Sequence, residues 1–161
     1  SMEDDRNSLF LNYKHFLEEV SPDGFIFENV AGLLNIEKGA VFERVKDEFR
    51  SVMPSLDGWV LQTENYGIPQ RRKRVFLIGA KEPSFKISAP APITMKPVED
   101  GLFAELKNWV GVEEALSDLP ELTQGQDGSN LKYISKPKSE YQRFMRGDIS
   151  VQEYLDTFID T

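Results

Sequence analysis

The stretch Phe25-Ile26-Phe27-Glu28-Asn29-Val30 decides the fold class that this sequence predicts. Its first three residues are uniformly apolar and follow the turn Ser21-Pro22-Asp23-Gly24, which is typical of a short strand covered on both faces. The apolar run ends abruptly at Glu28. In the preceding residues 7–20, apolar side chains recur at helical spacing and predict an amphipathic helix. A helix that leads into a buried strand favours an α/β fold.

The residues that follow extend this α/β layout. A second helix is predicted over about 39–53, because its apolar side chains lie on one stripe and Pro54 follows its end. Two strands are predicted next, at 59–63 and 74–79, on either side of the turn Tyr66-Gly67-Ile68-Pro69. The connection between these strands is too short for a helical crossover, so we expect them to pair antiparallel.

After Lys81 the sequence changes character. Four prolines are spread over residues 83–97, which show no sustained period and indicate a connector. Residues 125–130 predict a mobile loop, because glycine and polar turn formers dominate there. Ser139 and Ser150 are expected to cap two of the short helices in this half. Three such helices are predicted, at 112–116, 140–146 and 151–159.

The composition excludes several classes of site. The 161 residues include no cysteine, which rules out disulfides, thiolate metal sites and a cysteine nucleophile in this chain. A single histidine, His15, excludes a histidine-rich zinc site, and no acidic cluster has the spacing of metal ligands. We therefore expect no metal site.

The charge balance and the apolar runs limit the partners. With 27 acidic and 19 basic side chains the net charge is −8, so nucleic acid is not expected to wrap the whole surface, although a local basic site is compatible with this charge. No apolar run approaches the roughly 20 residues of a membrane helix, and we expect no secretory segment. The sequence predicts one soluble, cytoplasmic domain without a membrane partner. Ser1-Met2 is interpreted as a cloning scar.

Glu28 is the first candidate for chemistry. It would lie at the carboxyl end of a buried strand, the edge at which open α/β sheets bind ligands. Burial after three apolar residues would raise the pKa of its carboxyl group and let it donate a hydrogen bond near neutral pH. The alternative is that Glu28 and Asn29 only satisfy backbone amides where the strand ends, and the triplet alone favours that alternative.

The run Gln70-Arg71-Arg72-Lys73-Arg74 is the densest positive charge in the chain. Strand alternation would place Gln70, Arg72 and Arg74 on one face and the other two residues on the opposite face. Two arginines on one face form a fork for phosphate or carbonyl oxygen. An equally supported interpretation is a gatekeeper run that keeps an apolar strand from pairing at its edge.

Three segments, in this order and at these separations, resemble the cytosine-5 DNA methyltransferase family. Glu28-Asn29-Val30 is similar to the catalytic-glutamate motif of that family, and Gln70, Arg72 and Arg74 match its Gln-x-Arg-x-Arg motif. The resemblance covers about 4–80, and a looser similarity covers 112–122 and 141–146. The three segments are Asp4-Asp5-Arg6-Asn7-Ser8-Leu9-Phe10, Phe25 to Val30, and Asn65 to Gly79.

The resemblance implies a fold and a domain division. Residues 3–82 would form the carboxyl-side half of the catalytic domain, a partial Rossmann-like sheet of an S-adenosylmethionine-dependent methyltransferase. Residues 83–161 would be a mostly irregular and helical extension, which connects to the target-recognition region. The parent protein would transfer a methyl group from S-adenosylmethionine to C5 of a cytosine flipped out of double-stranded DNA.

The resemblance also implies roles for single residues. Glu28 would contact N3 and the exocyclic amine of the flipped cytosine, Arg74 would contact O2, and Arg72 would support the site or a phosphate. Asn29 and Gln70 would bind on the substrate side, with Asn29 bracing the nucleophile loop. Leu9 would lie near the edge of the cofactor.

Parts of the family pattern have no counterpart in this chain. They are the glycine-rich cofactor loop, the Pro-Cys nucleophile loop and the closing motifs. We therefore expect an excised middle piece that is inactive alone, binds S-adenosylmethionine weakly or not at all, and self-associates through the exposed edge of the strand at Phe25. Two alternatives stay open: a transfer-RNA cytosine-5 methyltransferase, and a catalytically dead α/β interaction module.

Overall fold

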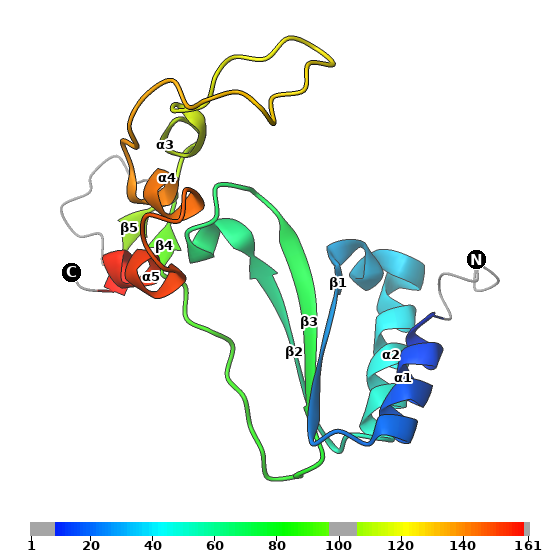
Figure 1. Cartoon of the computed structure of the whole chain (residues 1–161). Coiled ribbons are helices and arrows are strands. Elements are labelled where there is room, and N and C mark those ends of the chain that lie inside the picture. Colours follow the sequence, from blue (N-terminus) through cyan, green and yellow to red (C-terminus); the bar gives the residue numbers. More distant parts are fainter. Residues whose placement is uncertain (1–8, 97–105, 160–161) are drawn as a thin grey trace. The chain divides into compact units, whose positions relative to one another are not determined.

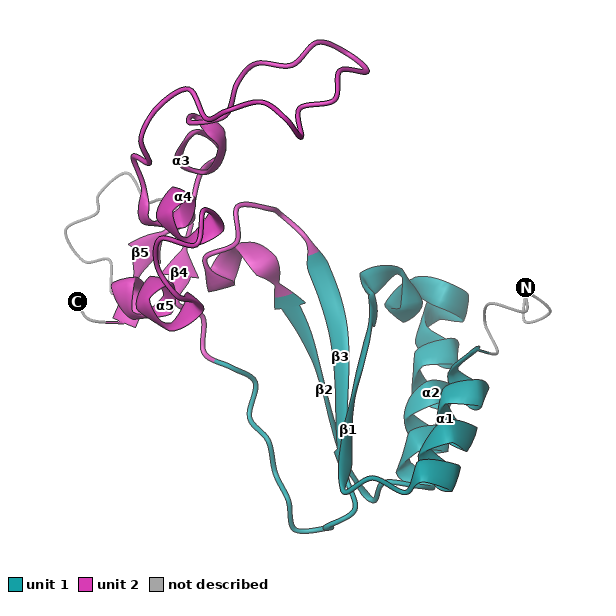
Figure 2. Ribbon diagram, in the orientation of Figure 1, with its two compact units in different colours: residues 1–61, 73–90 teal, residues 62–72, 91–161 magenta. Residues whose placement is uncertain are grey.

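The computed structural model describes residues 9–96 and 106–159, which divide into two compact units (Figures 1 and 2). Unit 1 comprises residues 1–61 and 73–90, and unit 2 comprises residues 62–72 and 91–161. The segment Asp4 to Ser8, which contributes to the family resemblance, lies outside the described residues, as do Ser1-Met2 and Pro97. The predicted division after residue 82 stays a prediction.

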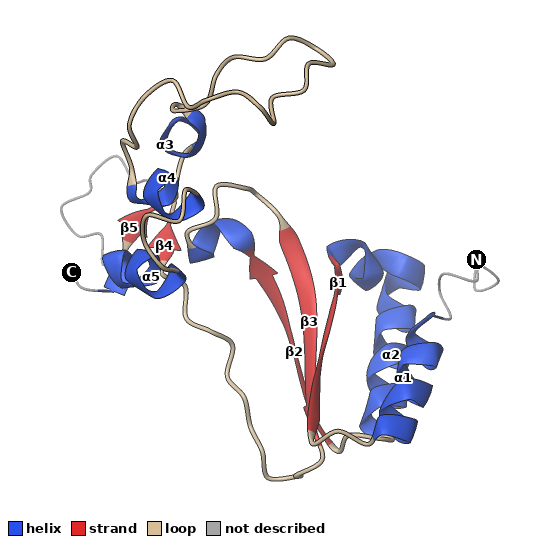
Figure 3. Ribbon diagram, viewed as in Figure 1, coloured by secondary structure: helices blue, strands red, loops and turns tan. Residues whose placement is uncertain are grey.

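Unit 1 is mixed α/β. Its strand order is β1-β3-β2, and β1 pairs antiparallel with β3. The chain reverses between β2 and β3, which are neighbours in the sheet as predicted (Figure 3). The elements are α1 (Leu9–Val20), β1 (Gly24–Val30), the 3-10 helix η2 (Ala31–Gly39), α2 (Ala40–Arg50), β2 (Ser55–Gln62) and β3 (Lys73–Ala80).

The core of unit 1 lies between the two α-helices and one face of the sheet (Figure 3). Burial of apolar side chains on this face supplies the main stabilisation of the unit. An aromatic group joins the helices to β1: Tyr13 and Phe49 contact Phe25 and Phe27, with ring centroids 5.1–5.9 Å apart. The most deeply buried members of the core are Leu17, Val45, Phe49, Met53 and Leu77.

β1 is covered on one face only, so the predicted cover on both faces is wrong. Phe25 is buried against the helices, whereas Ile26 is 65% exposed and Val30 is 51% exposed. Successive side chains of a strand point to opposite faces, and α1 and α2 pack on the side of Phe25 and Phe27. A run of three apolar residues is too short to tell one covered face from two.

The predicted second helix is shorter than expected. α2 ends at Arg50, and Met53, placed inside the helix by its spacing, is fully buried beyond the helix end. The 3-10 helix η2 was not anticipated. Glu37 and Lys38, within the bounds of η2, have φ of 49° and 56°, a left-handed conformation that kinks the chain before α2 begins at Ala40. β2 begins at Ser55, four residues before the predicted strand.

Unit 2 is built from short elements, and the three helices predicted for it are present. β4 and β5 pair parallel over two residues. Ser139 Oγ accepts a hydrogen bond from Gln142 N, and Ser150 Oγ accepts one from Glu153 N, so both predicted caps are confirmed. The elements are η3 (Thr63–Tyr66), β4 (Thr94–Met95), β5 (Lys107–Asn108), α3 (Val112–Leu116), α4 (Glu140–Met145) and α5 (Val151–Ile159).

The cap of α5 is reciprocal. Glu153 Oε2 accepts hydrogen bonds from the backbone N–H and from the hydroxyl of Ser150, at 2.7 and 2.8 Å. These bonds favour the ionised carboxyl group and hold the pKa of Glu153 below its ordinary value.

Within the ranges that the structure describes, no helix is long and apolar enough to cross a bilayer.

Candidate functional site

Glu28 and Arg74 form an ion pair across β1 and β3. The strand register places Val30 opposite Arg74, and Glu28 lies two residues from Val30 on the same face. Arg74 Nε is 2.5 Å from Glu28 Oε1, and Arg74 Nη1 donates to the carbonyl of Lys73. Glu28 and Arg74 therefore lie on the same face of the sheet.

The two partners differ in their exposure to solvent. The Arg74 side chain is only 14% exposed, whereas the Glu28 side chain is 47% exposed. The burial expected for Glu28 is therefore not found, because this face of β1 is open. The exposed carboxyl group of Glu28 and the largely buried guanidinium of Arg74 thus place a hydrogen-bond acceptor next to a donor at the carboxyl end of β1. This arrangement can hydrogen-bond a polar, planar ligand.

A cavity of about 420 Å³ lies at the same end of β1, between the sheet and the helices of unit 1. Leu9, from the start of α1, lines this cavity together with Asn29 and Val30. Asn29 Oδ1 accepts a hydrogen bond from Val30 N at 2.8 Å, which fixes the side chain at the strand end. The structure thus brings together Leu9 and Asn29, two residues that the sequence singled out separately.

Gln70 and Arg72 belong to unit 2, where they form part of a turn. Neither residue is in a strand, because β3 begins at Lys73, so the alternation expected over 70–74 is wrong. Thr63 holds both residues: its hydroxyl donates to Gln70 O and accepts from Arg72 N, and its backbone N–H donates to Arg72 O. The structure does not unite Gln70 and Arg72 with Glu28 and Arg74 in one described site.

The start of this turn is fixed at Gly67, which has φ of 72°. The phenol of Tyr154 donates to Gly67 O at 2.6 Å, and Gly67 N donates to Thr94 Oγ1 at 3.3 Å. Burial, with smaller effects from Tyr141 and Glu114, raises the pKa of Tyr154 far above its ordinary value. The phenol therefore stays a neutral donor and clamps the turn that carries Gln70 and Arg72.

Arg71 has a partner that the sequence did not reveal. Its guanidinium lies over the ring of Trp109, 5.3 Å from the centroid, and Trp109 Nε1 donates to Asn65 Oδ1 at 3.0 Å. A cation–π contact of this kind is worth about 0.5–1 kcal/mol at an exposed site. Neither Trp109 nor Tyr154 was predicted to contribute, because each reaches the turn from a distant part of the chain.

These features of unit 1 accompany a family match along almost the whole chain. The family model described as "C-5 cytosine-specific DNA methylase" matches residues 1–157. The chain belongs to this family. Within the described residues of this methylase chain, no group of three His, Cys, Asp or Glu side chains is placed to hold a metal ion.

Type II methyltransferases are among the relatives of this chain. It is 34% identical over 159 residues to the Type II methyltransferase M.AgeI of Thalassovita gelatinovora, a match that covers 91% of the chain and 37% of the relative. It is 32% identical over 146 residues to the Type II methyltransferase M.DdeI of Desulfomicrobium norvegicum, with 89% and 34% covered. The chain thus spans about a third of the length of these curated relatives.

A solved structure is similar in fold. It is a crystal structure described as a DNA modification methyltransferase encoded within a prophage of E. coli, and the two chains are 25% identical with a TM-score of 0.53. The match covers 74% of this chain and 32% of the other. The mixed α/β architecture predicted from the sequence agrees with this likeness.

The clamp at Gly67 can be tested with two alanine variants. Gly67 and Gly125 both have left-handed φ, of 72° and 81°, so alanine costs roughly 1–2 kcal/mol at either position. At Gly67 the added Cβ would also lie 3.0 Å from the Phe158 ring, whereas nothing lies within 4 Å of it at Gly125. We expect Gly67→Ala to be the more destabilising by about 1–3 kcal/mol, the usual cost of overpacking.

Urea unfolding followed by the fluorescence of Trp109 measures this difference in unit 2. The chain has two tryptophans, so a Trp59→Phe background isolates the signal of Trp109. Equal destabilisation by Gly67→Ala and Gly125→Ala would show that packing against Phe158 does not constrain the turn.

Proposed function

We propose that the protein containing this chain is a DNA (cytosine-5-)-methyltransferase, and that this chain supplies residues that bind the flipped cytosine. The observation that carries the proposal is the Glu28–Arg74 ion pair at the carboxyl end of β1, in a chain of the C-5 cytosine-specific DNA methylase family. Ligands of open α/β sheets bind at this edge. The pair offers both kinds of hydrogen-bonding group that one edge of cytosine requires.

Cytosine must be made susceptible to attack at C6, because an aromatic ring resists a nucleophile. Attack at C6 moves negative charge onto N3 and O2 of the ring. Glu28, in its protonated form, would donate to N3, and its other oxygen would accept from the exocyclic amine. Arg74 would donate to O2, and its guanidinium would stabilise the charge that develops there.

The ion pair holds both groups in place until a base binds. Glu28 would then leave Arg74, which turns to O2 of the base, and would take up a proton from solvent before it donates to N3. With no base present, Arg74 and Glu28 satisfy each other at 2.5 Å, so neither group is left without a partner on the open face of the sheet. Flipping a base out of the duplex costs a few kcal/mol, and new hydrogen bonds to the base must offset this cost. Because the strands fix both side chains before the base arrives, little further ordering is required.

Further residues would support the base and the cofactor. Arg72 would support the site or bind a phosphate, and Gln70 would bind on the substrate side, since both are held in an ordered turn by Thr63. Asn29 would brace the nucleophile loop. The Oδ1 of Asn29 is occupied by Val30 N, and in the described part of the chain no partner is present for Nδ2, which leaves that amide free to donate.

The cavity next to Leu9 and Asn29 fits the edge of S-adenosylmethionine. Its lining is mostly apolar, its volume is about 420 Å³, and a strand-end amide borders it. S-adenosylmethionine, when bound, supplies the methyl group that is transferred. Leu9 would pack against the edge of the cofactor, and the remaining contacts would come from other parts of the protein.

The sheet of unit 1 is compatible with one half of a Rossmann-like methyltransferase sheet. β1 has a single neighbour in the described residues, β3, and its other edge offers seven residues for pairing. A parent strand on that edge would lie beside β1 and extend the sheet sideways, next to the strand that carries Glu28 and Asn29. Double-stranded DNA would be the substrate, and S-adenosylmethionine the cofactor.

Methyl transfer by the complete protein tests the proposal. We expect labelled methyl groups from S-adenosylmethionine to be transferred to cytosine C5 of duplex DNA and not to transfer RNA. We also expect Arg74→Ala to lower kcat by about 100-fold or more, because removing one donor to a developing negative charge usually has an effect of this size. Lys73→Ala, next to Arg74 on the other face, and Arg71→Ala should change turnover only a few-fold. Equal and mild effects of all three substitutions would favour the gatekeeper interpretation, and label in transfer RNA alone would overturn the assignment to DNA.

The 161-residue chain by itself should be inactive. It contains no cysteine, so it has no thiolate to form the bond to C6 of the base. We expect no label above background when the purified chain is incubated with labelled S-adenosylmethionine and duplex DNA, and little retention of the cofactor on equilibrium dialysis. Specific transfer of label to cytosine would contradict the proposal that the nucleophile lies elsewhere in the protein.

The isolated chain should also self-associate through β1. An edge strand with unpaired backbone groups and exposed apolar side chains recruits a second strand. We expect dimers in sedimentation velocity, weakened by Ile26→Lys, which places a charge on this exposed face. Val112→Lys, at a similarly exposed position of unit 2, is the matched control. A monomer at high concentration would contradict this expectation.

A further inference from the structure

The segment 131–138 of unit 2, Leu131-Lys132-Tyr133-Ile134-Ser135-Lys136-Pro137-Lys138, is held in place although it has no regular secondary structure. We call it the lysine strip. Ile134 N donates to Asp118 O at 3.0 Å, Ser135 O accepts from Arg146 Nη2 at 2.8 Å, and Lys138 N donates to Gln142 Oε1 at 2.6 Å. Three backbone groups within five residues are therefore fixed.

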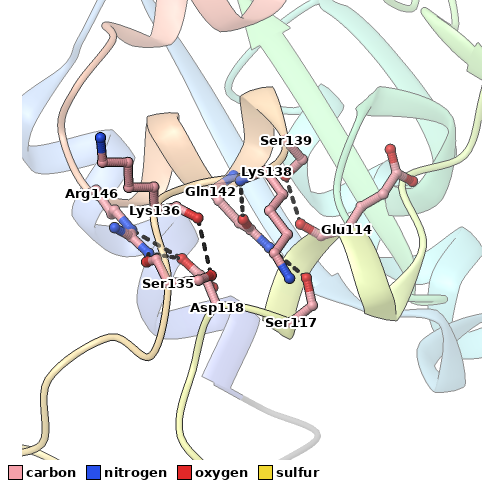
Figure 4. Close-up of polar contacts among 9 residues, drawn as sticks. All are labelled: Glu114, Ser117, Asp118, Ser135, Lys136, Lys138, Ser139, Gln142 and Arg146. Atoms are coloured by element: carbon pink, nitrogen blue, oxygen red, sulfur yellow. Dashed lines mark hydrogen bonds and ion pairs between the residues drawn. The ribbon is translucent and has the colours of Figure 1, made fainter.

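Two buried polar side chains, Asp118 and Gln142, and the partly exposed Arg146 hold the strip, and Figure 4 shows them together. Asp118 is 3% exposed and binds Arg146 through two hydrogen bonds, of 2.5 and 2.9 Å. Gln142 is 1% exposed, and its Nε2 donates to Ser117 Oγ at 3.1 Å. Breaking a buried pair such as Asp118–Arg146 costs about 3–5 kcal/mol, so the arrangement resists loosening.

The strip contrasts with the loop that leads into it. Between 119 and 131 the recorded hydrogen bonds are local, such as Gln126 N to Thr123 O and Leu131 N to Gly128 O. From Tyr133 onward the chain is anchored to buried residues, and the Tyr133 ring itself lies 3.7 Å from the Arg146 guanidinium. The fold thus orders an exposed segment that contributes little apolar burial.

The exposed side chains of the strip carry uncompensated positive charge. Lys132, Lys136 and Lys138 are exposed, and in the described part of the chain none of them forms an ion pair. The strip contains no acidic residue. Of the acidic groups nearby, Arg146 holds Asp118 and Arg143 holds Glu140 at 2.8 Å, whereas Glu114, which lines the same cavity as Lys138, accepts a hydrogen bond from Gly111 N at 2.9 Å. The three lysines therefore carry positive charge that no ion pair in the described residues compensates, in a chain whose net charge is −8.

We propose that the lysine strip is a docking surface for the phosphate backbone of the substrate DNA, which rests on the proposed function. Lysine is a flexible point charge that suits phosphate contacts without reading sequence. Lys132 and Lys138 lie six residues apart, at most about 20 Å along an extended chain. That length matches about six phosphates of one strand, at 3.4 Å each along the helix axis. Asp118, Gln142 and Arg146 are positioning residues that act through the strip.

The salt dependence of DNA binding by the complete protein tests the proposal. Each phosphate contact contributes about 0.9 to the slope of log affinity against log salt concentration. We expect the triple variant Lys132→Gln, Lys136→Gln and Lys138→Gln to reduce this slope by about 2–3, measured by fluorescence anisotropy with a labelled duplex. The matched control, Lys38→Gln, Lys81→Gln and Lys86→Gln, removes the same charge from exposed positions of unit 1 and should leave the slope within about 0.5 of the wild-type value.

The outcomes separate this proposal from the proposed function. A wild-type protein that neither binds nor methylates DNA overturns both. If the wild-type protein binds DNA, but the strip variant lowers the salt slope no more than the control variant, only the proposed role of the lysine strip is overturned. All six substitutions are on the surface, so loss of folding does not confuse the comparison.

Arg146→Lys tests the positioning role. Lysine keeps the charge but lacks the planar fork that holds Asp118 and Ser135 together. We expect faster amide exchange at Ile134 and Lys138 and a several-fold higher Kd for DNA, with kcat at saturating DNA unchanged. A lower kcat with an unchanged Kd would overturn the positioning role.

Discussion

The fixed register between β1 and β3 is the constraint on which unit 1 depends. Phe25 lies opposite Gly79, and a Cβ at Gly79 would come within 2.3 Å of the Phe25 ring, so only glycine lets this ring lie across β3 into the core. The same register places Val30 opposite Arg74 and thereby brings Arg74 to Glu28. A slip by one residue would turn Arg74 toward the helices and expose the core side chains. The register of β1 and β3 thus determines both the packing of the core on one face of the sheet and the Glu28–Arg74 ion pair on the other.

Several elements could be predicted because their signals are local. The serines that cap α4 and α5, the strand at 73–80 and the common face of Glu28 and Arg74 all follow from short patterns of residue type. Gln70 and Arg72 did not follow their pattern, because hydrogen bonds from Thr63 draw them into a turn. Strand alternation holds only where the chain is a strand, and tertiary contacts decide where that is.

Other features have no local signal. Tyr154 reaches Gly67 across 87 residues, and no spacing rule connects a phenol in a C-terminal helix with a glycine in a turn. The single covered face of β1 was missed because Phe25, Ile26 and Phe27 are equally apolar, although only Ile26 is exposed. The acidic residue Asp118 lies in a stretch rich in acidic residues that gives no local sign of burial, yet it is almost fully buried. Burial of a charge depends on the partner that the fold supplies, here Arg146.

The separation of β1 and β3 along the chain has a consequence for folding kinetics. Val30 and Arg74 are more than forty residues apart, whereas β2 and β3 are joined by a short connection. Because closing a long loop costs more chain entropy, we expect the local pair β2–β3 to form before β1 joins the sheet. Glu28 meets Arg74 only at that late step. The ion pair therefore marks completed folding of unit 1, and a kinetic intermediate that lacks β1 would have the arginine without its carboxylate.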